Sequence, residues 1–110
     1  MQPLLWILLD DEGLVVLSGG TQEADTEHMG SLIFMGYLPF RRALEQELSS
    51  ELREMMISTS EHLILLQPLE GNLLVVVFSH DTPLGIARLG LKKLVTQVNR
   101  ELRALTRERR

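Results

Sequence analysis

Apolar residues gather into two short runs at the start of the chain. Residues 4–9 (LLWILL) and 14–17 (LVVL) flank the acidic segment 10–13 (DDEG). Short apolar runs around a turn that ends in glycine are typical of a β-hairpin. The first run is apolar without alternation, which indicates a strand that is covered on both faces of its sheet.

Residues 23–47 carry the pattern of a long helix. Acidic residues crowd its start, where the helix dipole favours negative charge, and Thr21 is placed to cap the first turn. Pro39 falls inside this segment, and we expect it to kink or divide the helix.

Three strands are predicted next, over residues 52–59, 62–69 and 73–78. The first is the weakest of the three, since it mixes charged residues with apolar ones. The turns that join them are so short that the three strands are expected to form an antiparallel meander.

A closing helix is predicted from Pro83, which is suited to the first helical position, with Thr82 or Asp81 as the cap. Beyond Pro83, apolar residues recur every three or four positions among charged ones, which predicts an amphipathic helix. This apolar stripe consists of Leu84, Ala87, Leu91, Leu94, Val98, Leu102 and Leu105.

The order of elements is therefore β-β-α-β-β-β-α, an α/β chain of the α+β type. The runs at 4–9, 62–69 and 73–78 are continuously apolar, so both faces of the sheet need cover and the helices are expected on opposite faces. This predicts a five-stranded antiparallel sheet sandwiched by helices. A chain of 110 residues holds about one such core, so residues 1–110 are predicted to form a single domain.

Residues 29–40 (MGSLIFMGYLPF) carry no formal charge, although about a quarter of the chain is charged. On a helix, Met29, Ile33, Gly36 and Phe40 share one stripe, while their apolar neighbours point in other directions. One face of a sheet cannot cover all of these side chains. Burying the helix on every side within a monomer would take a larger domain than this chain can build.

A two-fold homodimer is the simplest solution, with this helix packed against its copy and small residues allowing close approach. The strand over residues 52–59 is polar enough to be an edge, and it is expected to pair with its mate across the same axis. A monomer with a wholly buried central helix is the alternative. The predicted interface consists of Met29, Gly30, Ile33, Phe34, Gly36, Tyr37, Phe40, Met55 and Ile57.

Charge is distributed unevenly along the chain. Residues 88–110 hold eight basic and two acidic residues, a net charge of +6, whereas residues 1–87 hold three basic and thirteen acidic residues, a net charge of −10. Residues 100–110 are therefore predicted to be a basic helix end or tail, whose cations complement the helix dipole. An acidic partner is a further interpretation. Nucleic acid is not expected, because no aromatic residue alternates with the arginines and the acidic body repels phosphate.

No motif for catalysis or cofactor binding is found. The chain has no cysteine, no phosphate-binding glycine loop, and only three histidines, of which none has the spacing of a metal site. His80 beside Asp81 is the nearest approach to an acid–base pair, but adjacent side chains rarely face each other. We therefore expect no enzyme activity, no metal and no cofactor. No apolar run is long enough to insert into a membrane, and a cytoplasmic protein is expected.

Three stretches resemble the roadblock family, which includes dynein light chains of the roadblock type and bacterial and archaeal relatives that accompany Ras-like GTPases. They are the opening hairpin LLWILLDDEGLVVLSGG, the strand pair HLILLQPLEGNLLVVVF and the closing HDTPLGIARLGLKKL. The resemblance implies a five-stranded antiparallel sheet between helices. It also implies dimers joined through the middle helix and third strand into one ten-stranded sheet.

The chain departs from the resemblance at its beginning. Many members of the family carry an extra helix before the first strand, whereas here the first strand starts almost at once, so a fold lacking that N-terminal helix is expected. Part of the sheet face beside the last helix then lacks that cover, and either the long C-terminal helix and tail or a partner is expected to supply it.

The resemblance implies a non-enzymatic homodimer that binds a small Ras-like GTPase and modulates its nucleotide cycle or its localisation. The residues expected to contact the partner lie on the exposed part of the middle helix: Arg41, Arg42, Glu45 and Gln46. An arginine inserted into the GTPase site is a less favoured role for Arg41 or Arg42. The alternative function is a purely structural adaptor with no effect on GTP hydrolysis, docking a peptide on the bare sheet face.

Overall fold

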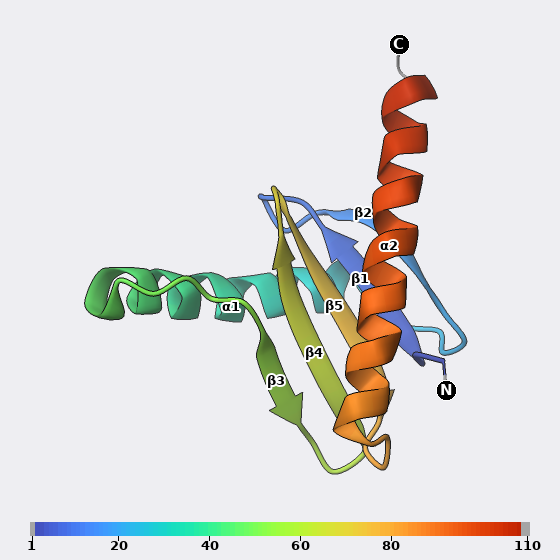
Figure 1. The fold of residues 1–110 in the computed structure, drawn as a ribbon, viewed down its shortest axis with the longest axis horizontal. Helices are drawn as coiled ribbons and strands as arrows, with labels where there is room; N and C mark the ends of the chain where they lie inside the picture. Colours follow the sequence, from blue (N-terminus) through green and yellow to red (C-terminus); the bar gives the residue numbers. More distant parts are fainter. Residues whose placement is uncertain (1, 109–110) are drawn as a thin grey trace.

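A computed structural model describes residues 2–108. Within that range, five strands form one antiparallel sheet in the order β2-β1-β5-β4-β3, with α1 on one face and α2 on the other (Figure 1). This confirms the predicted order and the sandwich of helices around the sheet. The elements are β1 (Leu5–Leu9), β2 (Val15–Gly20), α1 (Thr26–Leu48), β3 (Met55–Ser58), β4 (His62–Leu69), β5 (Asn72–Ser79) and α2 (Leu84–Glu108).

Strands β1 and β5 lie side by side in the centre of the sheet. Leu5 pairs with Val77 and Leu9 with Leu73, and every residue of β1 is buried. Both faces of these strands are covered, which explains why their sequences are apolar without alternation. The central pair is a non-local one, because β1 and β5 are separated in the sequence by the other strands and α1.

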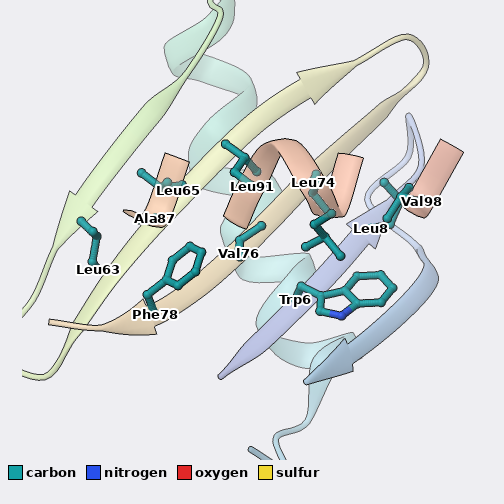
Figure 2. Packing of buried hydrophobic residues seen from close by; sticks show 11 residues of the cluster. Trp6, Leu8, Leu63, Leu65, Leu74, Val76, Phe78, Ala87, Leu91 and Val98 are labelled. Atoms are coloured by element: carbon teal, nitrogen blue, oxygen red, sulfur yellow. The ribbon is translucent and has the colours of Figure 1, made fainter. Parts of the chain in front are cut away.

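The core between the sheet and α2 is built from the predicted stripe. Ala87, Leu91 and Val98 of α2 belong to one buried cluster, in which Leu91 lies over Val76 of β5 and Val98 lies beside Leu8 of β1 (Figure 2). Leu94 is buried with them, and Leu84 and Leu102 pack at the margin. Burying these apolar side chains is the main stabilising contribution of α2.

The sheet face beside α2 is covered more fully than the sequence predicts. Trp6 extends its indole towards β2 (Figure 2) and is only 8% exposed, and its ring lies against Gly19. Leu17 packs beside this cluster, while Met56 of the edge strand β3 remains exposed. On the β2 side, part of the cover that the missing helix would give is supplied by one large aromatic side chain, which fills the space above a glycine.

The start of α1 differs from the prediction. The helix begins at Thr26, and Asp25 is its cap, with the carboxylate accepting a hydrogen bond from the backbone N–H of His28 at 3.1 Å. Thr21 is not the cap, because the N–H groups of Thr21 and Gln22 both donate to the carbonyl of Leu4. The segment before the helix is thus held to the sheet.

Pro39 does not divide α1, which is continuous from Thr26 to Leu48. A proline at position 39 leaves the carbonyl of Met35 without its helical donor. Both residues are exposed, so water can satisfy that carbonyl. The cost of the missing bond is therefore small enough for the helix to continue.

Other boundaries move by a few residues. Strand β2 continues to Gly20, and β3 is shorter than predicted because Leu52 packs against the α1 core and Glu54 forms an ion pair with Arg88 of α2 at 3.0 Å. The first helical hydrogen bond of α2 runs from the N–H of Ala87 to the carbonyl of Pro83, so the proline stands just before the helix. The helix continues through most of the predicted basic end, of which residues 109 and 110 lie outside the described part.

Candidate interaction surface

The inner side of α1 packs on the sheet of its own chain. Gly30 and Tyr37 are its buried residues. A Cβ at Gly30 would stand 2.8 Å from Cδ2 of Leu9, so the glycine lets the helix approach β1 closely. Phe34 and Tyr37 meet edge to face, with ring centroids 6.2 Å apart, and fix the middle of the helix on this core.

The outer side of α1 is also apolar but faces solvent. Met35 is 67% exposed and Phe40 is 63% exposed, and Leu32 and Leu48 are exposed as well. Gly36 has no neighbouring atom within 4 Å of a built Cβ. We call Leu32, Met35, Gly36 and Phe40 the outer α1 face, an exposed patch of the kind that marks an interaction site.

The predicted interface residues fall into three groups by burial. Gly30 and Tyr37 are buried against the sheet of the same chain. Gly36, Phe40 and Ile57 are exposed. The remaining four are half-buried and pack against the core beneath α1: Met29, Ile33, Phe34 and Met55.

Sequence reasoning left Leu32 and Met35 out of the interface set. Both lie on the side of the helix opposite Gly30, where the helical spacing places positions 32, 35 and 39 together. Helical spacing alone places Leu32 and Met35 on the side opposite Gly30. The sequence does not show that Gly30 packs on β1, and so it does not show which of the two sides faces solvent.

Strand β3 is an edge strand, as predicted. It pairs with β4 through Met55↔Leu66 and Ile57↔Ile64, and no strand within residues 2–108 lies on its other side. Met55 and Ile57 project to the face of the sheet that α1 covers, because their partners Leu66 and Ile64 belong to that core. The unpaired backbone of β3 is thus open to a further strand.

The opposite edge, β2, is less suited to pairing. The register of β1 and β2 shifts between Leu8 and Leu9, leaving Val16 as an extra residue, and the strand ends in Gly19 and Gly20. A bulge twists an edge strand and interrupts its ladder, which is a common way of protecting an edge. Strand β3 has no such bulge along its four paired residues.

The predicted partner-binding residues lie on the C-terminal half of α1. All four are exposed: Arg41, Arg42, Glu45 and Gln46. Nε of Arg41 donates to Oε1 of Glu45 at 3.0 Å, and this hydrogen bond raises the pKa of Arg41 above its ordinary value. An exposed pair of this kind adds little stability, so these side chains remain free to exchange partners.

Arg41 also lines a cleft of about 740 Å³. Its walls are α1 at Phe34 and Tyr37, the returning segment 51–53, and the β4–β5 turn. Charges of both signs line it, among them the acidic Asp10 and the basic Arg53.

Within residues 2–108, no helix is long and apolar enough to span a bilayer and no group of three His, Asp or Glu side chains is placed to hold a metal ion.

No protein-family model matches the sequence, and no curated protein matches it. Solved structures resemble the fold closely. MglB of Myxococcus xanthus is 24% identical with a TM-score of 0.76, covering 93% of this chain and 85% of its own. A Roadblock/LC7 domain from Streptomyces avermitilis is 20% identical with a TM-score of 0.77, covering 93% and 87%.

The gliding protein MglB of Thermus thermophilus is also similar, with 22% identity and a TM-score of 0.71 over 83% of this chain and 71% of its own. These likenesses confirm the roadblock fold that the sequence predicted. Identity at this level establishes the fold and leaves the partner to be inferred from the surface.

Proposed function

We propose that the protein is a cytoplasmic homodimer that binds a small Ras-like GTPase and modulates its nucleotide cycle or localisation. The observation that carries the proposal is the outer α1 face, which is apolar and exposed along a helix whose inner side is already packed. The roadblock fold, shared with MglB proteins, supports the choice of a GTPase as partner.

A second copy of the chain fits this face best. Leu32, Met35 and Phe40 are uncharged, so the same patch of a second copy can pack against them without burying a charge. A self-complementary apolar patch is the usual basis of a two-fold dimer. One of the solved MglB structures has a tetrameric arrangement, so assembly is compatible with this fold in that protein.

The edge strand β3 extends the same interface. Antiparallel pairing of β3 with its copy would continue the sheet across a two-fold axis normal to it. That axis keeps both α1 helices on one face of the combined sheet. Ile57, exposed at the edge and on the α1 side, would then be covered by the partner.

The partner surface is formed by the exposed polar end of α1. Arg41, Arg42, Glu45 and Gln46 follow the outer α1 face along a half of the helix that extends away from the sheet (Figure 1). In a dimer two such ends frame the paired helices. Regulation on this surface works by holding the switch segments of the GTPase in one arrangement, and it needs no catalytic group from the chain itself.

Titration of the protein into a Ras-like GTPase from the same organism tests the proposal. Binding is measured with the GTPase loaded with GDP or with a non-hydrolysable GTP analogue, and hydrolysis is followed in parallel. A complex that prefers one nucleotide state, and that weakens when Arg42 and Gln46 are replaced by alanine, supports it. Absence of binding in both states would overturn it, and binding with unchanged hydrolysis would instead indicate the structural adaptor.

A further inference from the structure

The solvent side of α2 is a continuous basic stripe. The helix turns its apolar residues to the sheet, and the cations between them are all exposed. Their spacing along the helix puts them on the side away from the core. We call this set the α2 stripe: Lys92, Lys93, Arg100, Arg103 and Arg107.

Acidic groups do not interrupt the stripe among the described side chains. Glu101 is the acid of α2 whose side chain the structure describes, and it is half-buried, with Nε2 of Gln97 donating to it at 3.3 Å. Arg88, which does have an acidic partner in Glu54, lies to one side at the start of the helix. On α2 itself no described acidic side chain lies between these five cations, and the acid that lines a groove with Arg103 and Arg107 is Glu70 of the β4–β5 turn.

The stripe is long and reachable by a flat surface. From Lys92 to Arg107 a helix rises about 22 Å. Figure 1 shows the C-terminal end of α2 running straight past the end of the sheet, while Glu70 of the β4–β5 turn still lines a groove beside Arg103 and Arg107. With a net charge of −10 on residues 1–87, the chain is an electric dipole that orients α2 towards an extended anionic surface.

An exposed apolar side chain lies within the same face. Leu89 is 51% exposed and directly precedes Lys92 and Lys93 on the solvent side, and Ile86 is exposed beside it. An apolar residue among cations gains free energy when it enters the boundary between lipid headgroups and acyl chains. Phosphates of a nucleic acid offer no such contact, so the combination favours a bilayer.

We propose that the solvent face of α2 binds the surface of membranes that contain anionic phospholipids. The α2 stripe contacts headgroup phosphates, and Leu89 and Ile86 enter the headgroup region without spanning the bilayer. Cations near an anionic membrane each strengthen binding, and the effect is screened by salt.

The dimer proposed above doubles this surface, and this step rests on the proposed function. If both α1 helices lie on one face of a ten-stranded sheet, both α2 helices lie on the other. The dimer then presents two stripes to the membrane and its α1 face to the GTPase on the opposite side. Two linked weak contacts bind more tightly than either alone.

Sedimentation with vesicles tests the membrane proposal on the chain alone, with no GTPase present. Vesicles of phosphatidylcholine with about 30% phosphatidylglycerol are compared with pure phosphatidylcholine at low and high salt. The protein is expected to bind the anionic vesicles and to be released by salt. Replacing both Arg100 and Arg103 by glutamate lowers the partition coefficient about tenfold or more, and Leu89→Ser lowers it severalfold.

Matched variants keep the result specific. Arg53→Glu reverses one exposed charge outside α2 and is compared with Arg100→Glu alone, which makes the same charge change on the stripe. Leu14→Ser removes a comparably exposed leucine at the β1–β2 turn. Arg53→Glu and Leu14→Ser are both expected to bind as the parent does. Circular dichroism checks that each variant is folded.

Equal partition onto both kinds of vesicle would overturn the proposal. The proposal would also be overturned if the protein bound a DNA duplex more tightly than anionic vesicles and if Leu89→Ser left the affinity for DNA unchanged. If the chain is monomeric and still binds anionic vesicles, the proposed dimer and its two stripes are overturned, whereas the proposal that α2 binds the membrane is supported.

Discussion

The indole of Trp6 lies against the backbone of Gly19 on the neighbouring strand. The two residues are paired across β1 and β2, and a Cβ built on Gly19 would stand 2.5 Å from Nε1 of Trp6. This contact covers the α2 side of the sheet at the Gly19 end of β2. The absence of a side chain at position 19 is therefore a packing requirement.

Gly19→Ala is expected to lower the free energy of unfolding by about 1 to 3 kcal/mol, because the methyl group must displace a buried ring. Chemical denaturation followed by Trp6 fluorescence measures the change. Gly85→Ala is the control, since nothing lies within 4 Å of its built Cβ and alanine favours a helix. Equal stability of Gly19→Ala and the parent protein would contradict the packing described.

Charge on the outer α1 face is expected to disrupt dimers. Phe40→Asp and Met35→Asp each place a carboxylate at the proposed contact, and the dissociation constant of the dimer should rise on the order of 100-fold. Sedimentation equilibrium over a range of protein concentrations measures it. Leu14→Asp is the matched control, because Leu14 is 62% exposed and lies on the β1–β2 turn. A parent chain that stays monomeric at high concentration would exclude the dimer.

Replacing Ser49 by glycine is expected to stabilise the protein. Ser49 ends α1 with φ 50°, in the left-handed region that L-residues adopt at a cost, while its N–H still bonds to the carbonyl of Leu44. Glycine keeps the bond and removes the strain, for a gain of about 0.5 to 1 kcal/mol. Thermal unfolding measures it. Ser50→Gly should lose stability instead, since Oγ of Ser50 donates to the carbonyl of Leu48.

Stability should depend on the ionisation of Asp81 at low pH. Oγ of Ser79 donates to Oδ1 of Asp81 at 2.5 Å, and this hydrogen bond holds the pKa of Asp81 below its ordinary value of 3.8. The lowered pKa means that the ionised carboxylate favours the folded state. Its contribution is complete above the unfolded pKa and is lost as the pH falls through the folded pKa.

Asp81→Asn removes this contribution. The difference in the free energy of unfolding between the parent and Asp81→Asn is expected to be constant near neutral pH and to shrink below about pH 4. Denaturation curves at several pH values measure it. A difference that does not change across the acid range would show that the carboxylate plays no part. Ser79→Ala should reproduce part of the effect, since it removes the donor.

Much of the fold could be predicted from local patterns. The turns at 10–13 and 70–72 separate apolar runs that became β1, β2, β4 and β5, and the spacing of Leu91, Leu94 and Val98 predicted the buried side of α2. The start of α1 was misplaced because Thr21 looks as good a cap as Asp25 in sequence. The difference was decided by the carbonyl of Leu4, which binds the N–H of Thr21.

By itself the sequence determined the order of the elements, the strands covered on both faces and the basic side of α2, because each depends on the periodicity of neighbouring residues. Only the tertiary structure decided which side of α1 faces the sheet. Residues 29–40 are apolar on every side of the helix, so the pattern of apolar residues does not distinguish a buried side from an exposed one. The close packing of Gly30 on Leu9 determines which side faces the sheet. That contact, distant in sequence, is what turns Leu32 and Met35 outward.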